Sequence, residues 1–208
     1  MPTMLHEVPS AIPNDVPVRK RWTRAEVERV ENAGVFEGQH WELIEGELIN
    51  KIRKKRPHSS ALRYVVVTLS RIFGELYIQH EVNIDVAPQD NPTSEPEPDV
   101  LVTRALPHEY AKNPGPADIR LLAEVADSSL GFDTRTKAAL YARAGIGEYW
   151  VLDVRKRRLL VFRDPAEGRY RSIAQYGDSE LITPAEAPAG ASILVSDLFG
   201  PPVPEPSL

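Results

Sequence analysis

The chain has 208 residues, of which 42% are hydrophobic and 26% are charged, values typical of a globular protein built around one domain-sized core. It contains no cysteine, which excludes a disulfide scaffold, a thiolate metal site and a cysteine nucleophile. The formal net charge is −5, so binding to nucleic acid requires the basic residues to be segregated on the surface. The sequence has neither an apolar run long enough to cross a membrane nor a signal peptide, which predicts a cytoplasmic protein without membrane contact.

The sequence predicts one domain over residues 21–200, between a proline-containing N-terminal arm (1–20) and a proline-rich tail (201–208). Thr23, with Glu26 three residues later, has the pattern of a capping box and predicts a helix that runs to Gly34. Two short strands follow, over 41–44 and 47–52, with a tight turn at Glu45 and Gly46 between them.

The remaining elements are predicted from the spacing of apolar residues. Apolar residues at helical spacing predict a long helix over 59–76. Alternation of apolar and polar residues predicts a strand over 82–86, which an acidic, proline-rich loop (88–98) follows. Strands are expected at 99–103, 119–125, 148–153 and 158–163, with shorter strands near 169–174 and 192–195 extending the hairpin, and a helix at 134–144 that Gly145 ends. This mixed order predicts an α/β fold in which helices flank a central mixed β-sheet.

Two carboxylates adjoin strands that otherwise appear buried. Asp99 begins one strand and Glu124 lies near the end of the next. A buried carboxylate is costly unless it is paired or binds a cation, and two on neighbouring strands repel each other. Hard oxygen ligands of this kind suit Mg²⁺ or Mn²⁺. The pair therefore indicates a divalent metal site, which would polarise a phosphoryl oxygen and activate water.

Pro98-Asp99 and Glu124-Val125-Ala126 resemble the signature of the PD-(D/E)XK nuclease superfamily. The wider pattern is similar to one branch, the Uma-two family of bacterial restriction-endonuclease-like proteins, over roughly residues 21–200. The matching residues are Trp41 to Leu48, Pro57-His58, Pro98-Asp99-Val100, Glu124 to Ser129, Asp133, Lys137, Tyr141, Gly145 to Trp150 and Asp153. The resemblance implies the restriction-endonuclease-like fold, Mg²⁺ or Mn²⁺ as cofactor, and Asp99, Glu124 and the Val125 carbonyl as metal ligands.

The sequence departs from the superfamily at one position. The superfamily lysine stands two residues after the glutamate, where the side chains of a strand point the same way, and here that residue is Ala126. In the resembling branch a lysine on the next helix takes its place, and Lys137 holds the matching position. The resemblance therefore implies a catalytic set of Asp99, Glu124 and Lys137.

Each of these residues also has a purely structural interpretation. Asp99 could end the preceding loop, Glu124 could pair with Arg120 or Arg143, and Lys137 could be an exposed helix lysine. Further candidates are Glu42 as an additional metal-site carboxylate, with an exposed hairpin position as the alternative, and Ser128 and Tyr141 as supporting residues, where Ser128 could instead cap the coming turn and Tyr141 could belong partly to the core.

A dense basic cluster precedes the long helix. If it follows a phosphate backbone, the nucleic-acid-binding residues are Arg53, Lys54, Lys55 and Arg56, with Lys51 nearby and His58 beside them. Lysine and arginine provide most of the affinity for nucleic acid, but such a cluster is also typical of a solvated loop. His58 could equally be an exposed residue at a helix start.

Three functions are compatible with these features. The first is a Mg²⁺- or Mn²⁺-dependent endonuclease acting on nucleic acid, with DNA favoured over RNA. The second is a catalytically idle module that binds nucleic acid or protein, supported by the acidic net charge and by Ala126. The third is a metal-dependent hydrolase of small phosphoesters, because the acidic loop over 88–98 would repel a polyanion. A homodimer is compatible with the first function, but no dimer surface can be identified from the sequence.

Overall fold

The computed structural model describes residues 19–51 and 56–201. Its centre is a six-stranded sheet in the order β3-β4-β5-β6-β7-β8, in which β5 and β6 run parallel and the other neighbours antiparallel. The strands are β3 (Ile78–Gln79), β4 (Val100–Thr103), β5 (Ile119–Ala126), β6 (Glu148–Asp153), β7 (Arg158–Ala166) and β8 (Arg169–Gly177). The predicted mixed central sheet is confirmed.

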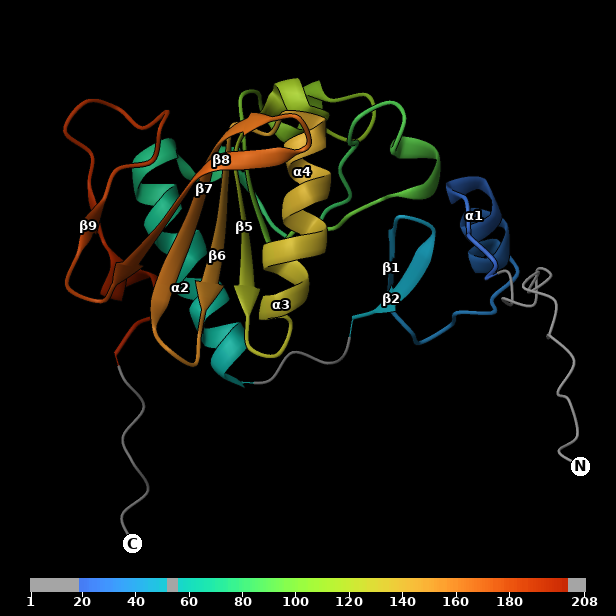
Figure 1. Cartoon of the computed structure of the whole chain (residues 1–208), viewed down its shortest axis with the longest axis horizontal. Helices are drawn as coiled ribbons and strands as arrows, with labels where there is room; N and C mark the ends of the chain where they lie inside the picture. Colours follow the sequence, from blue (N-terminus) through green and yellow to red (C-terminus); the bar gives the residue numbers. More distant parts are fainter. Residues whose placement is uncertain (1–18, 52–55, 202–208) are drawn as a thin grey trace, which may run out of the picture.

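Helices cover both faces of this sheet (Figure 1). On one face α2 (Arg56–Phe73) packs Ala61, Val65 and Leu69 onto the buried side chains of β4 and β5. On the other face lie α3 (Leu130–Phe132), a π-helical turn (Asp133–Lys137) and α4 (Ala138–Ala144). This second helical segment connects the parallel strands β5 and β6, because parallel neighbours require a crossover rather than a tight turn.

A smaller unit stands beside the central sheet. It consists of α1 (Arg24–Asn32) and an antiparallel hairpin of β1 (Trp41–Ile44) and β2 (Glu47–Asn50), which lie apart from the main sheet in Figure 1. The expected capping box at Thr23 and Glu26 is present. The expected turn is also present, with φ of 49° at Glu45 and 79° at Gly46, the positive values that a tight hairpin turn requires.

The predicted strand over 82–86 is wrong. The alternation correctly indicated burial, since Ile84 and Val86 are buried. The backbone hydrogen bonds are not those of a strand, however: the amide of Ile84 donates to the Pro96 carbonyl and the amide of Asp85 to the Pro114 carbonyl. These contacts come from two different segments and form no ladder. The facing loop contains four prolines between residues 88 and 98, and proline has no amide hydrogen to donate to a strand.

Several boundaries also differ from the prediction. The long helix starts at Arg56 rather than Ser59, and it ends at Phe73 rather than Leu76, because Gly74 adopts a φ of 93°. The helix expected at 134–144 begins earlier, through α3 and the π turn. Within the described part of the chain, short 3₁₀ helices occupy Glu75–Tyr77, Asn91–Thr93, Pro107–Glu109, Pro116–Asp118 and Val195–Leu198.

The last predicted strand does not extend the central sheet. β10 (Ile193–Leu194) instead pairs with β9 (Leu181–Ile182) in a separate two-stranded sheet, whereas β8 does extend the hairpin as expected. Among residues 19–51 and 56–201, none of the helices combines the length and the apolar character that a membrane span requires.

Candidate active site

The pairing of β4 with β5 brings the two predicted carboxylates together. These strands are antiparallel, with Val100 opposite Ala123, so continuing that register by one residue places Asp99 opposite Glu124. Both side chains are buried. The start of one strand and the end of its neighbour thus meet at the same edge of the sheet.

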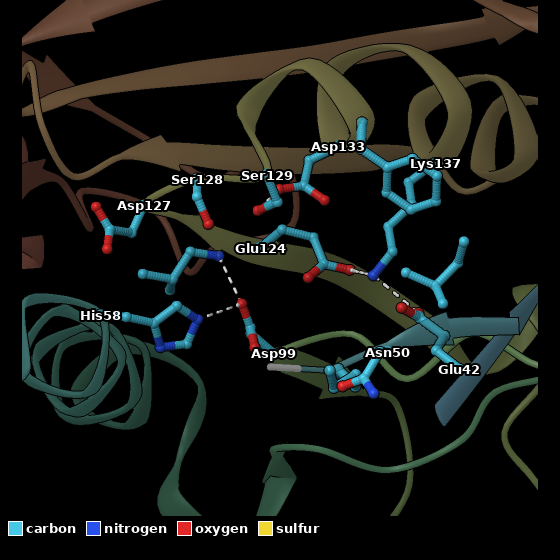
Figure 2. Close-up of a pocket in the computed structure, with 14 residues that line it drawn as sticks. Glu42, Asn50, His58, Asp99, Glu124, Asp127, Ser128, Ser129, Asp133 and Lys137 are labelled. Atoms are coloured by element: carbon cyan, nitrogen blue, oxygen red, sulfur yellow. Dashed lines mark hydrogen bonds and ion pairs between the residues drawn. The ribbon is translucent and has the colours of Figure 1, made fainter. Parts of the chain in front are cut away.

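A pocket of about 270 Å³ opens at this edge. Its walls come from four places in the chain: β1 and β2, the beginning of α2, the start of β4 with the end of β5, and the segment from residue 127 to the π turn (Figure 2). The lining residues are Glu42, Ile49, Asn50, Lys51, His58, Asp99, Glu124, Val125, Asp127, Ser128, Ser129, Phe132, Asp133 and Lys137. Asp99, Glu124 and Lys137 therefore share one pocket.

Lys137 reaches down from the helical layer and joins two carboxylates (Figure 2). Its Nζ lies 2.9 Å from Glu124 Oε1 and 2.8 Å from Glu42 Oε1, and the lysine is only 3% exposed. An exposed helix lysine is thereby excluded. The structural pairing of Glu124 with Arg120 or Arg143 is excluded as well, since Arg120 lies over Phe73 and Tyr77, and Arg143 binds Asp90 and Glu45.

Asp99 is held by groups from two elements. Its Oδ2 accepts a 2.7 Å hydrogen bond from the backbone amide of Val125 and lies 3.2 Å from Nε2 of His58 on α2. His58 is mostly buried and lines the pocket, so it is not an exposed residue at the helix start. Its other ring nitrogen, Nδ1, is buried and has no hydrogen-bond partner among the described residues.

Glu42 connects the hairpin to the π turn and to the proline-rich loop. Besides Lys137, its Oε1 accepts a 2.9 Å hydrogen bond from the backbone amide of Glu97 in the proline-rich loop. Glu42 is buried rather than exposed. Both donors, the Lys137 ammonium group and the Glu97 amide, bind the same oxygen of Glu42. In this structure Glu42 therefore acts as an ion-pair partner of Lys137.

Tyr141 and Ser128 both border the site. Tyr141, one helical turn after Lys137, is buried, and its hydroxyl donates to Glu124 Oε1 at 3.1 Å. It therefore belongs to both the core and the site. Ser128 lines the pocket.

Sequence reasoning gave no role to Asp133 or Ser129. Asp133 is buried in the pocket wall, where its Oδ2 accepts a 2.6 Å hydrogen bond from Ser129 Oγ. One signal was available in the sequence, namely the recurrence of polar residues every four positions at 129, 133, 137 and 141.

Burial and mutual repulsion alter the ionisation of these groups. Burial, opposed by Lys137 and reinforced by Asp99, raises the pKa of Glu124 to about 8. Burial likewise raises the pKa of Asp133 to about 6. For Lys137, burial acts against protonation, but Glu124, Glu42 and Asp133 outweigh it and raise the pKa well above its usual value. The lysine therefore stays protonated.

The pKa of Glu124 predicts a pH dependence of stability. A carboxyl group whose pKa rises from 4.5 to about 8 on folding binds more protons in the native state over that interval, so stability falls as the pH increases through it. In the presence of EDTA, the melting temperature of the wild type should fall more between pH 6 and pH 9 than that of Glu124→Gln, measured by differential scanning fluorimetry. If the melting temperatures of the two proteins fall in parallel with pH, the pKa of Glu124 is not raised on folding.

The predicted nucleic-acid-binding cluster is described only in part. Arg53, Lys54 and Lys55 lie outside the described residues, and Arg56 is exposed at the start of α2. Lys51 is bound internally, since its Nζ lies 2.7 Å from the Glu97 carbonyl oxygen and 3.2 Å from the Glu97 carboxylate. Lys51 thus neutralises a neighbouring acid of the protein.

Within the described ranges, no group of three or more histidine, aspartate or glutamate side chains is arranged so that it could hold a metal ion. The position of Lys137 explains part of this, because its ammonium group lies between Glu42 and Glu124. The donor chemistry nevertheless fits a hard cation. The pocket is lined by five carboxylates (Glu42, Asp99, Glu124, Asp127, Asp133) against two lysines (Lys51, Lys137), an excess of acidic oxygens that favours Mg²⁺ or Mn²⁺.

Comparison with known proteins gives a family and a fold for the chain. A family model described as "Uma2: Putative restriction endonuclease" matches residues 24–196. A solved structure from Anabaena variabilis ATCC 29413, described as "a putative nuclease belonging to DUF820", has a TM-score of 0.65 and 16% sequence identity and covers 86% of this chain and 97% of that chain. At this identity the likeness establishes the fold. No curated protein matches.

Proposed function

The chain belongs to the Uma2 (Uma-two) family of restriction-endonuclease-like proteins, and we propose that it is a Mg²⁺- or Mn²⁺-dependent endonuclease that hydrolyses phosphodiester bonds, with DNA as the favoured substrate. The observation that carries the proposal is the convergence of Asp99, Glu124 and Lys137 in one pocket. These residues come from the start of β4, the end of β5 and the following helical segment, and folding brings them to one pocket.

The charge of the pocket explains why a cation would be required. Even with Glu124 protonated at neutral pH, four other acidic residues stand against two lysines, so the pocket is acidic and a phosphodiester would be repelled from it. Asp99, Glu124 and the Val125 carbonyl would hold Mg²⁺ or Mn²⁺. When bound, the cation supplies positive charge that polarises a phosphoryl oxygen and makes a water molecule more acidic.

Lys137 contributes a fixed positive charge. Because its pKa is well above the usual value, it does not accept a proton at neutral pH. Its role in the proposal is to stabilise the negative charge that develops on the phosphoryl oxygens in the transition state. Glu42 and Glu124 hold the ammonium group in place, with contacts of 2.8 and 2.9 Å, so little reorganisation is needed during the reaction.

His58 would orient Asp99 as a metal ligand. His58 would donate the hydrogen on Nε2 to Asp99 Oδ2, at 3.2 Å, beside the hydrogen bond from the Val125 amide. Two donors on one oxygen fix the rotation of a carboxylate, as is usual for ligands in metal sites.

The basic cluster is proposed to bind the phosphate backbone. Changing Lys54 and Lys55 to alanine should weaken binding equally for all sequences, and it should flatten the plot of log K against log salt by about 0.9 per lost phosphate contact. Fluorescence anisotropy with labelled duplex DNA over a range of NaCl concentrations measures both effects. Changing Arg169 and Arg171 on β8, which are 78% and 65% exposed, provides a control with the same loss of charge. If the slope of log K against log salt is equal for the two double variants, the cluster does not bind the phosphate backbone.

The proposed activity is tested with a panel of substrates. Purified protein is incubated with Mn²⁺ or Mg²⁺ and supercoiled plasmid, single-stranded DNA, RNA or a small phosphodiester such as bis(p-nitrophenyl) phosphate. Nicking or linearisation of the plasmid would support the endonuclease. Binding of DNA without cleavage of any substrate would indicate the idle module, and cleavage of the small ester alone would indicate a phosphoester hydrolase.

A further inference from the structure

The helical segment that carries Lys137 contains one irregular turn. Between α3 and α4, the backbone amide of Ala138 donates to the carbonyl oxygen of Asp133, five residues earlier, which defines the π turn over Asp133–Lys137. Single π turns inside α-helices are rare and occur frequently at functional sites. Here the turn ends at the lysine that meets Glu124.

The π turn changes which side chains share a face. Four polar residues recur at intervals of four: Ser129, Asp133, Lys137 and Tyr141. In a regular α-helix with 3.6 residues per turn, residues four apart are rotated by about 40° at each step, so this series would wind around the axis. The wider π turn opposes that rotation between Asp133 and Lys137. Both side chains line the pocket (Figure 2), and the Tyr141 hydroxyl still reaches Glu124.

Two hydroxyl groups bind the backbone at this turn. The hydroxyl of Tyr149, a fully buried residue of β6, donates to the Asp133 carbonyl oxygen at 3.1 Å. Thr134 Oγ1 donates to the Leu130 carbonyl oxygen at 2.6 Å, a contact of the kind that bends helices. Tyr149 lies opposite Leu122 in the register of β5 and β6. Its contact therefore ties the first residue of the π turn to the sheet that carries Glu124.

We propose that Tyr149 and Thr134 are positioning residues that maintain the π turn and thereby hold the Lys137 ammonium group between Glu42 and Glu124. The reading of this arrangement as catalytic rests on the proposed nuclease function. The positioning itself does not. A π turn contains one residue more than a regular α-helical turn. If it relaxes to regular α-helix, the position of Lys137 therefore rotates by about 100° about the helix axis, away from Glu124.

The chain provides a matched control for Tyr149. Tyr170 belongs to the same aromatic cluster, with its ring centroid 6.3 Å from that of Tyr149. Its buried hydroxyl also donates to a backbone carbonyl oxygen, that of Ile146 at 2.9 Å, but this carbonyl lies outside the π turn. Tyr149→Phe and Tyr170→Phe each remove one hydroxyl and one buried hydrogen bond. A difference between the two variants therefore reports the effect of the hydrogen bond to the π turn rather than the general cost of losing a buried hydroxyl.

The first readout is independent of catalysis. Folded protein is treated with acetic anhydride, and the fraction of Lys137 that is acetylated is measured by mass spectrometry relative to the exposed Lys112. We expect several-fold more acetylation of Lys137 in Tyr149→Phe than in the wild type, and no increase in Tyr170→Phe. The second readout is plasmid cleavage with Mn²⁺, in which Tyr149→Phe should lower kcat on the order of tenfold to a hundredfold with KM unchanged, the scale of a small misplacement of a catalytic group.

Equal acetylation of Lys137 in the two phenylalanine variants would overturn the proposal. If the wild type cleaves nothing, the proposed function fails and acetylation alone decides the positioning. If Tyr149→Phe does not fold, Thr134→Val takes its place. Its control is Thr68→Val, which also removes a hydroxyl that donates to a backbone carbonyl, that of Asp197. More acetylation of Lys137 in Thr134→Val than in Thr68→Val would support the proposal, and equal acetylation would overturn it.

Discussion

Replacing Lys137 by alanine is expected to lower the turnover number for phosphodiester cleavage by about two orders of magnitude or more, the usual cost of removing one electrostatic stabiliser. The lysine is protonated and buried beside Glu124. Its removal takes a positive charge away from the developing charge on the phosphate. Metal affinity should stay the same or increase slightly, since one positive charge has left the neighbourhood of the cation. Steady-state cleavage of plasmid DNA with Mn²⁺ measures the first effect, and the melting-temperature shift with Mn²⁺ the second.

A control must account for the loss of stability. Lys137→Ala leaves two buried carboxylates without their cation, and breaking a buried ion pair typically costs about 3–5 kcal/mol. Arg163→Ala provides the comparison, because Arg163 pairs with the buried carboxylate of Glu148 away from the pocket. Both variants should be less stable, but Arg163→Ala should retain turnover when assayed at a temperature where both are folded. Full activity in Lys137→Ala would refute the assignment.

Replacing Asp99 by asparagine should abolish the stabilisation by Mn²⁺. A ligand that binds only the native state raises the free energy of unfolding by RT ln(1 + [L]/Kd), about 2.7 kcal/mol at one hundred times Kd. Asparagine preserves the size of the side chain and an oxygen that can accept the hydrogen bond from the Val125 amide, but it lacks the negative charge that binds the cation. The wild type should therefore melt at a higher temperature with excess Mn²⁺, whereas Asp99→Asn should not.

Asp153→Asn is the matched control for this variant. Asp153 is also a buried aspartate, at the end of the neighbouring strand β6, where it pairs with Arg158. It does not line the pocket, so its Mn²⁺ shift should equal that of the wild type. An equal shift in Asp99→Asn would remove Asp99 from the metal site.

The sequence was sufficient for the parts of the site that depend on strands. Asp99 and Glu124 each adjoin a continuous apolar run, and such runs predict buried neighbouring strands. Lys137 was found through the family pattern. The structure supplies the physical reason for its place on the helix: Ala126, at the position of the usual superfamily lysine, is 1% exposed and packed within the core. A lysine there would overpack that core.

The rest depended on contacts between distant segments. Glu42 lies in a short hairpin, and its pairing with Lys137 follows from how that hairpin docks beside the sheet. Alternation identified Ile84 and Val86 as buried, but it could not show that they form no strand. The loop that faces them, residues 88–98, contains four prolines, which have no amide hydrogen to complete a ladder. The π turn was not predicted, since its cause includes the Tyr149 hydroxyl on another element. The spacing of apolar residues along the chain thus indicates which residues are buried, but it does not show which distant segments pair with each other.

In the proposed mechanism, Asp99 and Glu124 bind the cation required for phosphodiester hydrolysis. Mn²⁺-dependent cleavage of supercoiled plasmid by three charge-removing variants tests this role: Asp99→Asn, Glu124→Gln and Glu148→Gln. Glu148 is as buried as the other two acids but lies outside the pocket. The wild type and Glu148→Gln should cleave the plasmid, and the other two variants should not. Cleavage by Asp99→Asn and Glu124→Gln at the wild-type rate would contradict this role.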